Sequence, residues 1–181
     1  TWLQRVISRF LALALILATG SEHRKLGVPG EAELLGKGVS YCALCDAPLF
    51  KEQEVMVIGG GDVALNDALY LARFASRVTI VHRRHELRAS AILQEKAFAE
   101  PRLSFQWNSV VERIIGNGLL ASVELRRVDT GQRLEMKATG VFVAIGSEPN
   151  THFLEGKMKL GTGGTVPTNE LMETEVPGVF A

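Results

Sequence analysis

The sequence predicts an α/β fold with a parallel sheet and an added antiparallel β-meander, and three observations support this prediction. A short apolar run, Val55–Ile58, is typical of a buried strand and precedes a glycine cluster and a run with helical periodicity. Arg77-Val-Thr-Ile-Val81 follows as a second strand. Strand-like runs then alternate with Gly116-Asn-Gly118 and Asp129-Thr-Gly131, which are hairpin turn signals.

The N-terminal part of the chain is expected to contain one short element and a connector. Phe10–Ala18 is apolar and runs into Ala18-Thr19-Gly20, which favours a buried strand or the end of a helix. A short signal peptide is the alternative, because Arg5 and Arg9 precede this run. Residues 21–38 contain several glycines and a proline, which indicates a connector.

The helices and the remaining strands are predicted from periodicity and from end signals. The first helix is expected over residues 62–74, with Asp62 as its N-cap and an apolar side made of Val63, Leu65, Leu69 and Ala72. A second helix is expected over residues 89–99 and is stopped by Pro101. The last buried strand is Gly140–Gly146, and the strand-like runs before it cover 103–107, 110–115, 119–127 and 133–137. Together these elements predict a Rossmann-like domain of three layers.

Composition excludes several classes of protein. The 181 residues include 20 Lys and Arg against 20 Asp and Glu, so charge gives no reason to expect nucleic acid or a membrane surface as a partner. A hydrophobic content of 46% is that of a globular domain rather than of a disordered chain. No apolar run reaches the length of a transmembrane helix, and two cysteines are too few for a disulfide scaffold.

The glycine cluster predicts a dinucleotide-binding loop. Gly59, Gly61 and Ala64 form the pattern G-x-G-x-x-A between a strand and a helix, with Gly60 and Asp62 inside it. The first glycine allows a tight turn, the second lets the backbone approach a pyrophosphate, and the small third residue allows helix and strand to pack closely. The N-terminus of the helix adds free N–H groups and the positive end of its dipole. The alternative is a turn with a purely structural role.

A basic cluster follows the second strand of this unit. His82, Arg83 and Arg84 stand at the C-terminal end of that strand, with Arg88 beyond them, about twenty residues after the glycines. An NAD site usually has an acidic residue there to bind the ribose 2′-hydroxyl, whereas arginines suit the 2′-phosphate of NADP. The sequence therefore favours NADPH as the nucleotide, and a solvated basic loop is the alternative.

Cys42 and Cys45 have the spacing of a redox motif. At the start of a helix the dipole would lower the pKa of a thiol and favour disulfide exchange. The neighbouring Asp46 could carry a proton to or from a leaving thiolate. Half of a zinc site or two small buried residues are the alternatives. Zinc would need two more ligands, and the four histidines show no suitable pair, so no metal is expected.

Together these motifs resemble one family, the low-molecular-weight thioredoxin reductases, which are two-domain flavoproteins. The resemblance extends from about Ala18 to Ala181 and rests on motifs in matching order: Ala18-Thr19-Gly20, Leu26-Gly-Val-Pro-Gly30, Cys42-x-x-Cys45-Asp46, Gly59-Gly-Gly-x-x-Ala64, His82-Arg-Arg84 with Arg88, Val143-Ala-Ile-Gly146 and Pro149-Asn150. The flavoprotein of alkyl hydroperoxide reductase is an alternative, although paired arginines are not expected there. A non-catalytic NADPH-binding module that senses redox state is another.

The resemblance implies a reaction in which NADPH reduces FAD, FAD reduces the disulfide between the two cysteines, and the dithiol reduces thioredoxin. Cys45 would face the flavin, Cys42 would attack the disulfide of the partner, and Asp46 would be the acid. Further cofactor contacts are implied for Ala18, Thr19, Gly20, Ile145 and Gly146. A cytoplasmic enzyme is implied, which is a homodimer when full length and has neither nucleic acid nor a membrane as a partner.

The same resemblance divides the chain into three parts. Residues 1–25 would be a remnant of the FAD domain and a connector, residues 26–146 the NADPH-binding domain with the two cysteines, and residues 147–181 the start of a returning FAD-domain segment. The N-terminal half of the FAD domain, with its own glycine fingerprint, has no counterpart in the sequence. The chain is therefore expected to be a fragment that binds FAD weakly or not at all.

Overall fold

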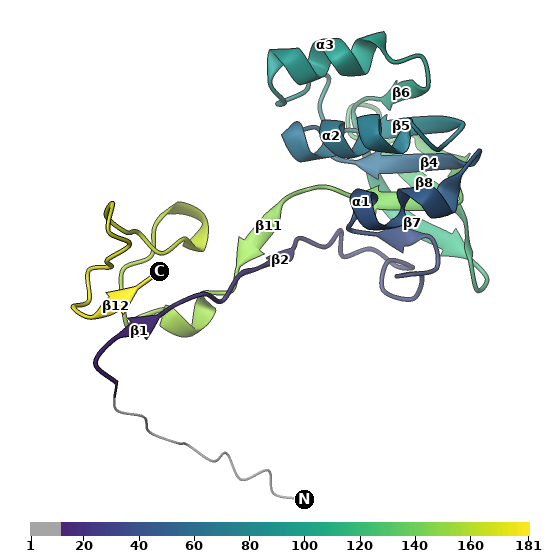
Figure 1. Cartoon of the computed structure of the whole chain (residues 1–181). Helices are drawn as coiled ribbons and strands as arrows, with labels where there is room; N and C mark the ends of the chain where they lie inside the picture. The colour runs from purple at the N-terminus through teal and green to yellow at the C-terminus, as the bar shows by residue number, and fades with distance from the viewer. Residues whose placement is uncertain (1–11) are drawn as a thin grey trace, which may run out of the picture. The chain divides into compact units, whose positions relative to one another are not determined.

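The computed structural model describes residues 12–181, and this part of the chain forms two compact units (Figure 1). The larger unit is His23–Gly146. The smaller unit combines the described residues up to Glu22 with Ser147–Ala181. The chain therefore passes between the units twice, and at this passage the strands β2 (Ser21–His23) and β11 (Ser147–Pro149) pair with each other.

A five-stranded sheet is the centre of the larger unit, and all its strands are parallel. Its spatial order is β3 (Val39–Ser40), β10 (Gly140–Val143), β4 (Glu54–Ile58), β5 (Arg77–Val81) and β6 (Leu103–Gln106). The parallel sheet predicted from the sequence is confirmed, and β3 is an additional edge strand. This order places the ends of β10, β4 and β5 side by side.

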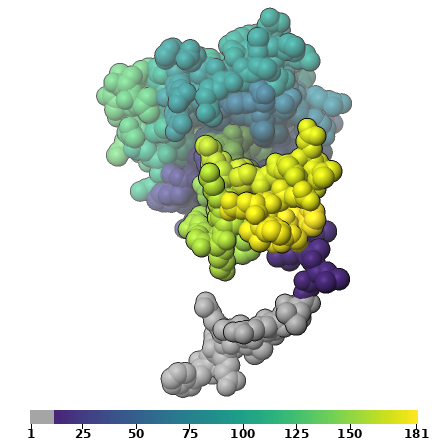
Figure 2. Space-filling view, turned by 90° about the vertical axis from the view of Figure 1, so that its left-hand side faces the viewer, coloured from purple at the N-terminus to yellow at the C-terminus, as the bar shows by residue number. Residues whose placement is uncertain are grey.

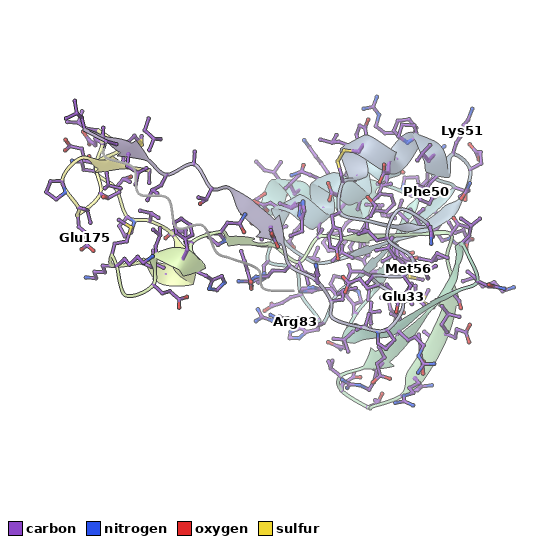
Figure 3. The ribbon with its side chains drawn as sticks, turned by 90° about the horizontal axis from the view of Figure 1, so that it is seen from below. Glu33, Phe50, Lys51, Met56, Arg83 and Glu175 are labelled. Atoms are coloured by element: carbon purple, nitrogen blue, oxygen red, sulfur yellow. A yellow bond between two sulfur atoms is a disulfide. The ribbon has the colours of Figure 1, made fainter. Side chains whose placement is uncertain are left out.

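Apolar side chains cover both faces of this sheet, which explains why its strands are continuous apolar runs. Successive residues of a strand point to opposite faces, so Val55 and Val57 belong to one core while Met56 and Ile58 belong to the other. Figure 3 shows Met56 enclosed within the unit. The first core is closed by α2 (Asp62–Leu71) and α3 (Ala91–Ala99), together with the short α1 (Ala43–Asp46) and η1 (Ala47–Phe50).

The second core is closed by an antiparallel meander of three strands, β7 (Ser109–Gly116), β8 (Leu120–Arg127) and β9 (Arg133–Lys137). Both predicted hairpin turns are present. Gly118 and Gly131 take positive φ values of 81° and 73° there, which glycine adopts without steric cost. Helices, parallel sheet and meander make three layers, as the sequence predicts.

Helix α2 differs from its prediction in its end and in its buried side. It ends at Leu71 rather than at residue 74, and its N-cap is Gly61 rather than Asp62. Of the predicted apolar side, Leu65 and the C-cap residue Ala72 are buried as expected, whereas Val63 is 63% exposed; the other buried positions of the helix are Ala64, Ala68 and Leu71. The buried side combines leucines with alanines, which let the helix approach the strands closely, so it agrees with the predicted side in part and differs from it at Val63.

The smaller unit is built from short elements. β1 (Leu15–Ile16) pairs in parallel with β12 (Val179–Phe180). Residues 147–181 form one lobe in Figure 2, which includes the 3₁₀ helices η2 (His152–Leu154) and η3 (Thr162–Gly164). A strand is present within residues 10–18, as the sequence predicts, but the prediction that it is buried is wrong, since Leu15 and Ile16 are 52% and 75% exposed. Within the described residues the sheet of β1 has only two strands. Residues 10 and 11 of that run lie outside the described part.

Candidate functional site

The carboxyl ends of three neighbouring strands bring the predicted nucleotide-binding residues to one edge of the sheet. A glycine loop, Gly59–Gly61, follows β4, an arginine loop, residues 82–90, follows β5, and residues 144–146 follow β10. Backbone hydrogen bonds extend the strand pairing into these loops: the Gly59 N–H donates to the Val81 carbonyl at 3.1 Å, and the Ala144 N–H donates to the Ile58 carbonyl at 2.9 Å. Open α/β sheets bind their ligands at this edge.

The glycines of the loop have different reasons to be glycine. A Cβ on Gly59 would lie 2.4 Å from the carbonyl oxygen of Ala144, and a Cβ on Gly60 would lie 2.4 Å from the imidazole of His82. A Cβ on Gly61 would have no atom within 4 Å, so this residue borders open space. Packing therefore requires Gly59 and Gly60, while Gly61 leaves room for a phosphate to approach the backbone.

The arginine loop presents guanidinium groups to solvent. Arg83, Arg84 and Arg88 are exposed, whereas Leu87 and Ala89 are buried in the first core and fasten the loop to it. Figure 3 shows Arg83 at the surface. No ion pair within residues 12–181 involves these three arginines, so their charges are available to an anionic ligand.

His82 lies behind the glycine loop and not at the surface with the arginines. The residue is 6% exposed, and its ring packs against Gly60. Burial is the main cause that lowers the pKa of His82, and the charges of the three arginines lower it further. A backbone hydrogen bond with Glu86 raises it, but the net shift is downward. The imidazole is therefore neutral at neutral pH, and within the described structure its Nε2 has no hydrogen-bond partner.

Two hydrogen bonds join the glycine loop and the start of α2 to the arginine loop. The Arg88 N–H donates to the Gly60 carbonyl at 2.8 Å, and the Ser90 N–H donates to Oδ1 of Asp62 at 2.7 Å. Asp62 is the first residue of α2, and Ser90 is the N-cap of α3. Sequence reasoning missed Ser90, because 28 residues separate it from Asp62. Its only signal in the sequence is a serine directly before a helical run.

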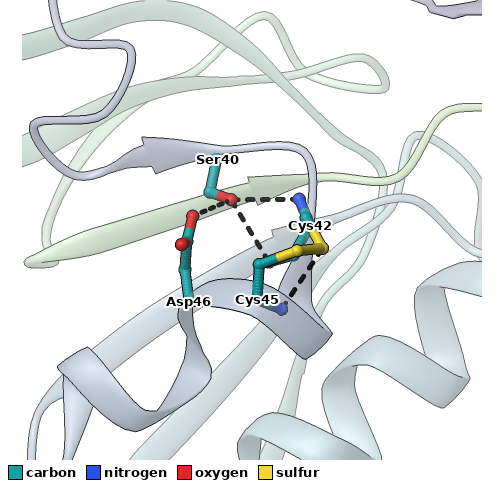
Figure 4. Close-up of a disulfide and its surroundings, with 4 residues drawn as sticks. All are labelled: Ser40, Cys42, Cys45 and Asp46. Atoms are coloured by element: carbon teal, nitrogen blue, oxygen red, sulfur yellow. Dashed lines mark hydrogen bonds between the residues drawn. A yellow bond between two sulfur atoms is a disulfide. The ribbon is translucent and has the colours of Figure 1, made fainter.

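Cys42 and Cys45 form a disulfide, with their Cα atoms 5.3 Å apart (Figure 4). Cys42 is half-buried and is the N-cap of α1, and its Sγ accepts a hydrogen bond from the Cys45 N–H at 3.2 Å. Cys45 is exposed. Helix α1 has four residues, so the dipole effect expected from the sequence is small here. The reactivity of the pair therefore depends mainly on the groups around it.

Ser40 connects the predicted acid to the disulfide segment. Its hydroxyl donates to Oδ2 of Asp46 at 2.7 Å and accepts a hydrogen bond from the Cys42 N–H at 3.0 Å (Figure 4). Ser40 is 6% exposed and ends β3, so it holds the carboxylate of Asp46 in a defined position. The sequence places Asp46 next to Cys45, but nothing in it indicates that a serine six residues earlier fixes the side chain.

The remaining predicted cofactor contacts are divided between the two units. In the smaller unit the side-chain amide of Asn150 donates to the Thr19 carbonyl, and the Asn150 N–H donates to the Gly20 carbonyl, both at 3.0 Å. Ala18, Thr19 and Gly20 are exposed and belong to no helix or strand. Ile145 and Gly146 belong to the larger unit.

Residues 12–181 contain no group of three or more His, Cys, Asp or Glu side chains that could hold a metal ion. The same residues include no helix long and apolar enough to cross a bilayer, and the longest helix described, α2, has 10 residues.

The sheet, the glycine loop and the disulfide define a class of protein. A sequence profile of the pyridine nucleotide-disulphide oxidoreductases matches residues 7–181, and the chain belongs to this family. Within it the chain is similar to thioredoxin reductases, with 49% identity over 178 residues to that of Peptoclostridium litorale and 48% identity over 173 residues to that of Bacillus subtilis. These alignments include 95% of the chain but 56% and 55% of the two relatives, so the chain spans about half of their length.

Solved structures show the same relationship. The thioredoxin reductase of Lactococcus lactis matches 92% of the chain with a TM-score of 0.85 and 44% identity. The thioredoxin reductase of T. acidophilum matches 92% of the chain with a TM-score of 0.84 and 31% identity. The chain covers 55% of each of these structures. The similarity therefore extends from sequence to fold over nearly all of this chain.

Proposed function

We propose that this chain is the nucleotide-binding and disulfide-bearing part of an NADPH-dependent thioredoxin reductase. One observation carries the proposal: residues 23–146 combine the Cys42–Cys45 disulfide with the glycine loop and with three arginines that form no ion pair in the described part of the chain. The similarity to thioredoxin reductases supports it. The arginines favour it over a flavoprotein of the alkyl hydroperoxide reductase type.

The residues at the sheet edge fit NADPH. Gly61 borders open space at the N-terminus of α2, where backbone N–H groups and the helix dipole favour the pyrophosphate. Arg83, Arg84 and Arg88 would meet the 2′-phosphate, which carries nearly two negative charges at neutral pH. An acidic residue that would favour NADH is missing from this loop end, since His82 is followed directly by two arginines.

The disulfide would carry the reducing equivalents to the partner, with residue roles that follow the family resemblance. NADPH and FAD, when bound in the whole enzyme, would supply two electrons. Two electrons and two protons break the S–S bond and give two thiols. The Cys42 thiolate would then attack the disulfide of thioredoxin, and the Cys45 thiolate would attack Sγ of Cys42, which releases reduced thioredoxin and restores the disulfide. Asp46, held by Ser40, would give a proton to the leaving thiolate.

The division into domains belongs to the same proposal. Residues 26–146 would bind NADPH, and residues 1–25 and 147–181 would belong to the FAD domain, with Ala18-Thr19-Gly20, Ile145 and Gly146 among the cofactor contacts. The residues present do not fit FAD alone, because the sequence has no second glycine fingerprint between a strand and a helix. The full-length protein would be a cytoplasmic homodimer that acts on thioredoxin.

The test is NADPH-dependent reduction of thioredoxin by the full-length protein, followed by the appearance of thiols on thioredoxin. Activity is expected with NADPH, and it should be lost in Cys42→Ser and in Cys45→Ser. Substituting Ser122, a buried serine of the meander, with Ala gives a control outside the site and should retain activity. NADPH oxidation that leaves thioredoxin oxidised, or activity that survives both cysteine substitutions, would contradict the proposal.

A further inference from the structure

We propose that Asp62 and the backbone of Arg88 form a latch that joins the glycine loop to the arginine loop, so that the pyrophosphate and 2′-phosphate sites act as one unit. This inference rests on the proposed binding of NADPH. It makes Asp62 a positioning residue for the arginines and not a direct ligand of the nucleotide.

Two hydrogen bonds make the latch. The Arg88 N–H donates to the Gly60 carbonyl at 2.8 Å, and the Ser90 N–H donates to the carboxylate of Asp62 at 2.7 Å. They hold the arginine loop on both sides of Ala89, which is buried at 6% exposure. The guanidinium groups remain exposed, but the backbone that carries them is fixed to the start of α2.

The bond to Gly60 also orients the next peptide group. In a trans peptide the C=O and the N–H point in opposite directions, and the chain has no cis peptide bonds among its described residues. Because the Gly60 carbonyl is directed to the arginine loop, the Gly61 N–H is directed away from it, at a residue that borders open space. The same hydrogen bond therefore positions a donor for the pyrophosphate and the loop for the 2′-phosphate.

His82 keeps the two loops at a set spacing. Its ring fills the space where a Cβ of Gly60 would lie, at 2.4 Å. The residue is 6% exposed and its Nε2 has no hydrogen-bond partner in the described structure, so its contact with the glycine loop is one of packing. A side chain at residue 60 would push the loops apart and strain both hydrogen bonds.

The charge and the hydrogen bond of Asp62 have opposite effects on an anionic ligand. The carboxylate repels the phosphates, whereas its bond to Ser90 holds the arginines in place to attract them. Asn at this position keeps an acceptor oxygen and removes the charge, while Ala removes both. The two substitutions therefore separate the latch from simple electrostatics.

The experiment is calorimetric titration of the 181-residue chain with NADPH and with NADH, in variants at Asp62. Asp62→Ala should weaken NADPH binding about tenfold, the equivalent of one hydrogen bond to a charged group, and NADH binding at most about twofold. Asp62→Asn should bind NADPH at least as tightly as the unchanged chain. Asn66→Ala, at an exposed position of the same helix, is the matched control and should bind like the unchanged chain.

A double-substitution cycle tests the coupling directly. In a chain that already carries Arg83→Ala, Arg84→Ala and Arg88→Ala, Asp62→Ala should have little further effect on NADPH, because no guanidinium group of the loop remains to be positioned, while the backbone N–H of residue 88 is kept. Full additivity of the losses would overturn the proposal. Equal losses for NADPH and NADH, or an Asn variant as weak as the Ala variant, would also overturn it.

Amide hydrogen exchange without nucleotide separates this inference from the proposed function. The Ser90 amide should be protected in the unchanged chain and in Asp62→Asn, and it should exchange much faster in Asp62→Ala. Unchanged protection in Asp62→Ala would overturn the latch even where NADPH binds well. If neither nucleotide binds the unchanged chain while Ser90 is protected as expected, the proposed function fails and the role of the latch in binding fails with it.

Discussion

Replacing both Arg83 and Arg84 by alanine should remove most of the preference for NADPH over NADH that the proposed function assigns to this chain. Both side chains are exposed and form no ion pair within the described residues, so their removal leaves no partner unsatisfied and should not affect folding. A charge-assisted hydrogen bond contributes about 1.5–3 kcal/mol, and the exposed setting favours the lower end. Two such bonds, about 3 kcal/mol together, correspond to somewhat more than a hundredfold in affinity.

The assay is titration calorimetry with both nucleotides at low and high salt. NADPH affinity of the variant should fall by about a hundredfold while NADH affinity barely changes, and the loss should shrink at high salt because surface charges are screened. Arg77→Ala is the control, since Arg77 is exposed at the opposite end of β5. Equal losses for both nucleotides would mean that the arginines serve the fold or the shared pyrophosphate, and the reasoning on selectivity would be refuted.

Four further predictions follow from the same structure. The unfolded, oxidised chain should contain no titratable thiol and should show two after reduction, whereas two thiols before reduction would rule out the redox pair. Gly60→Ala should lower the free energy of unfolding by about 1–3 kcal/mol, because its Cβ meets the His82 ring, while Gly61→Ala should change it by less than about 0.5 kcal/mol. Urea unfolding measures both variants, and equal losses of stability would contradict the packing argument. The free energy of unfolding should decrease from pH 7 to pH 5, because burial lowers the pKa of His82 in the folded chain and the unfolded chain therefore binds the proton first. This decrease should be smaller in His82→Phe, and an unaltered decrease in that variant would contradict the assignment to His82. The isolated chain should elute from gel filtration without FAD, and stoichiometric retention of flavin would show that the residues present suffice for it.

The larger unit could be predicted well because its strands carry their own signals. Val55–Ile58 is apolar throughout and Arg77–Val81 is rich in Val and Ile, so both can be recognised as buried strands from their own residues, without knowledge of their neighbours in the sheet. The turn glycines at 118 and 131 fix the hairpins of the meander in the same local way. The apolar side of α2 is harder to predict, because two alanines are buried beside Leu65 and Leu71 while the larger Val63 is exposed.

The contacts that position the site could not be predicted from the sequence. Ser40 reaches Asp46 and Ser90 reaches Asp62 only after strands and loops have been placed by the fold, and neither pair has a sequence spacing that indicates a contact. The exposure of Leu15 and Ile16 also depends on what surrounds β1, which local hydrophobicity does not reveal. The sequence can thus predict which residues of a motif contribute to the site, whereas the residues that hold them in position can be identified only from the structure.

Electrons from the nucleotide should reduce the Cys42–Cys45 disulfide, and an anaerobic titration of the full-length protein with NADPH tests this transfer most directly. The thiols formed are counted and mapped by alkylation and mass spectrometry. Two new thiols, at Cys42 and Cys45, are expected for each NADPH consumed, and far fewer thiols are expected with an equal amount of NADH. NADPH consumption with the disulfide still intact would contradict it.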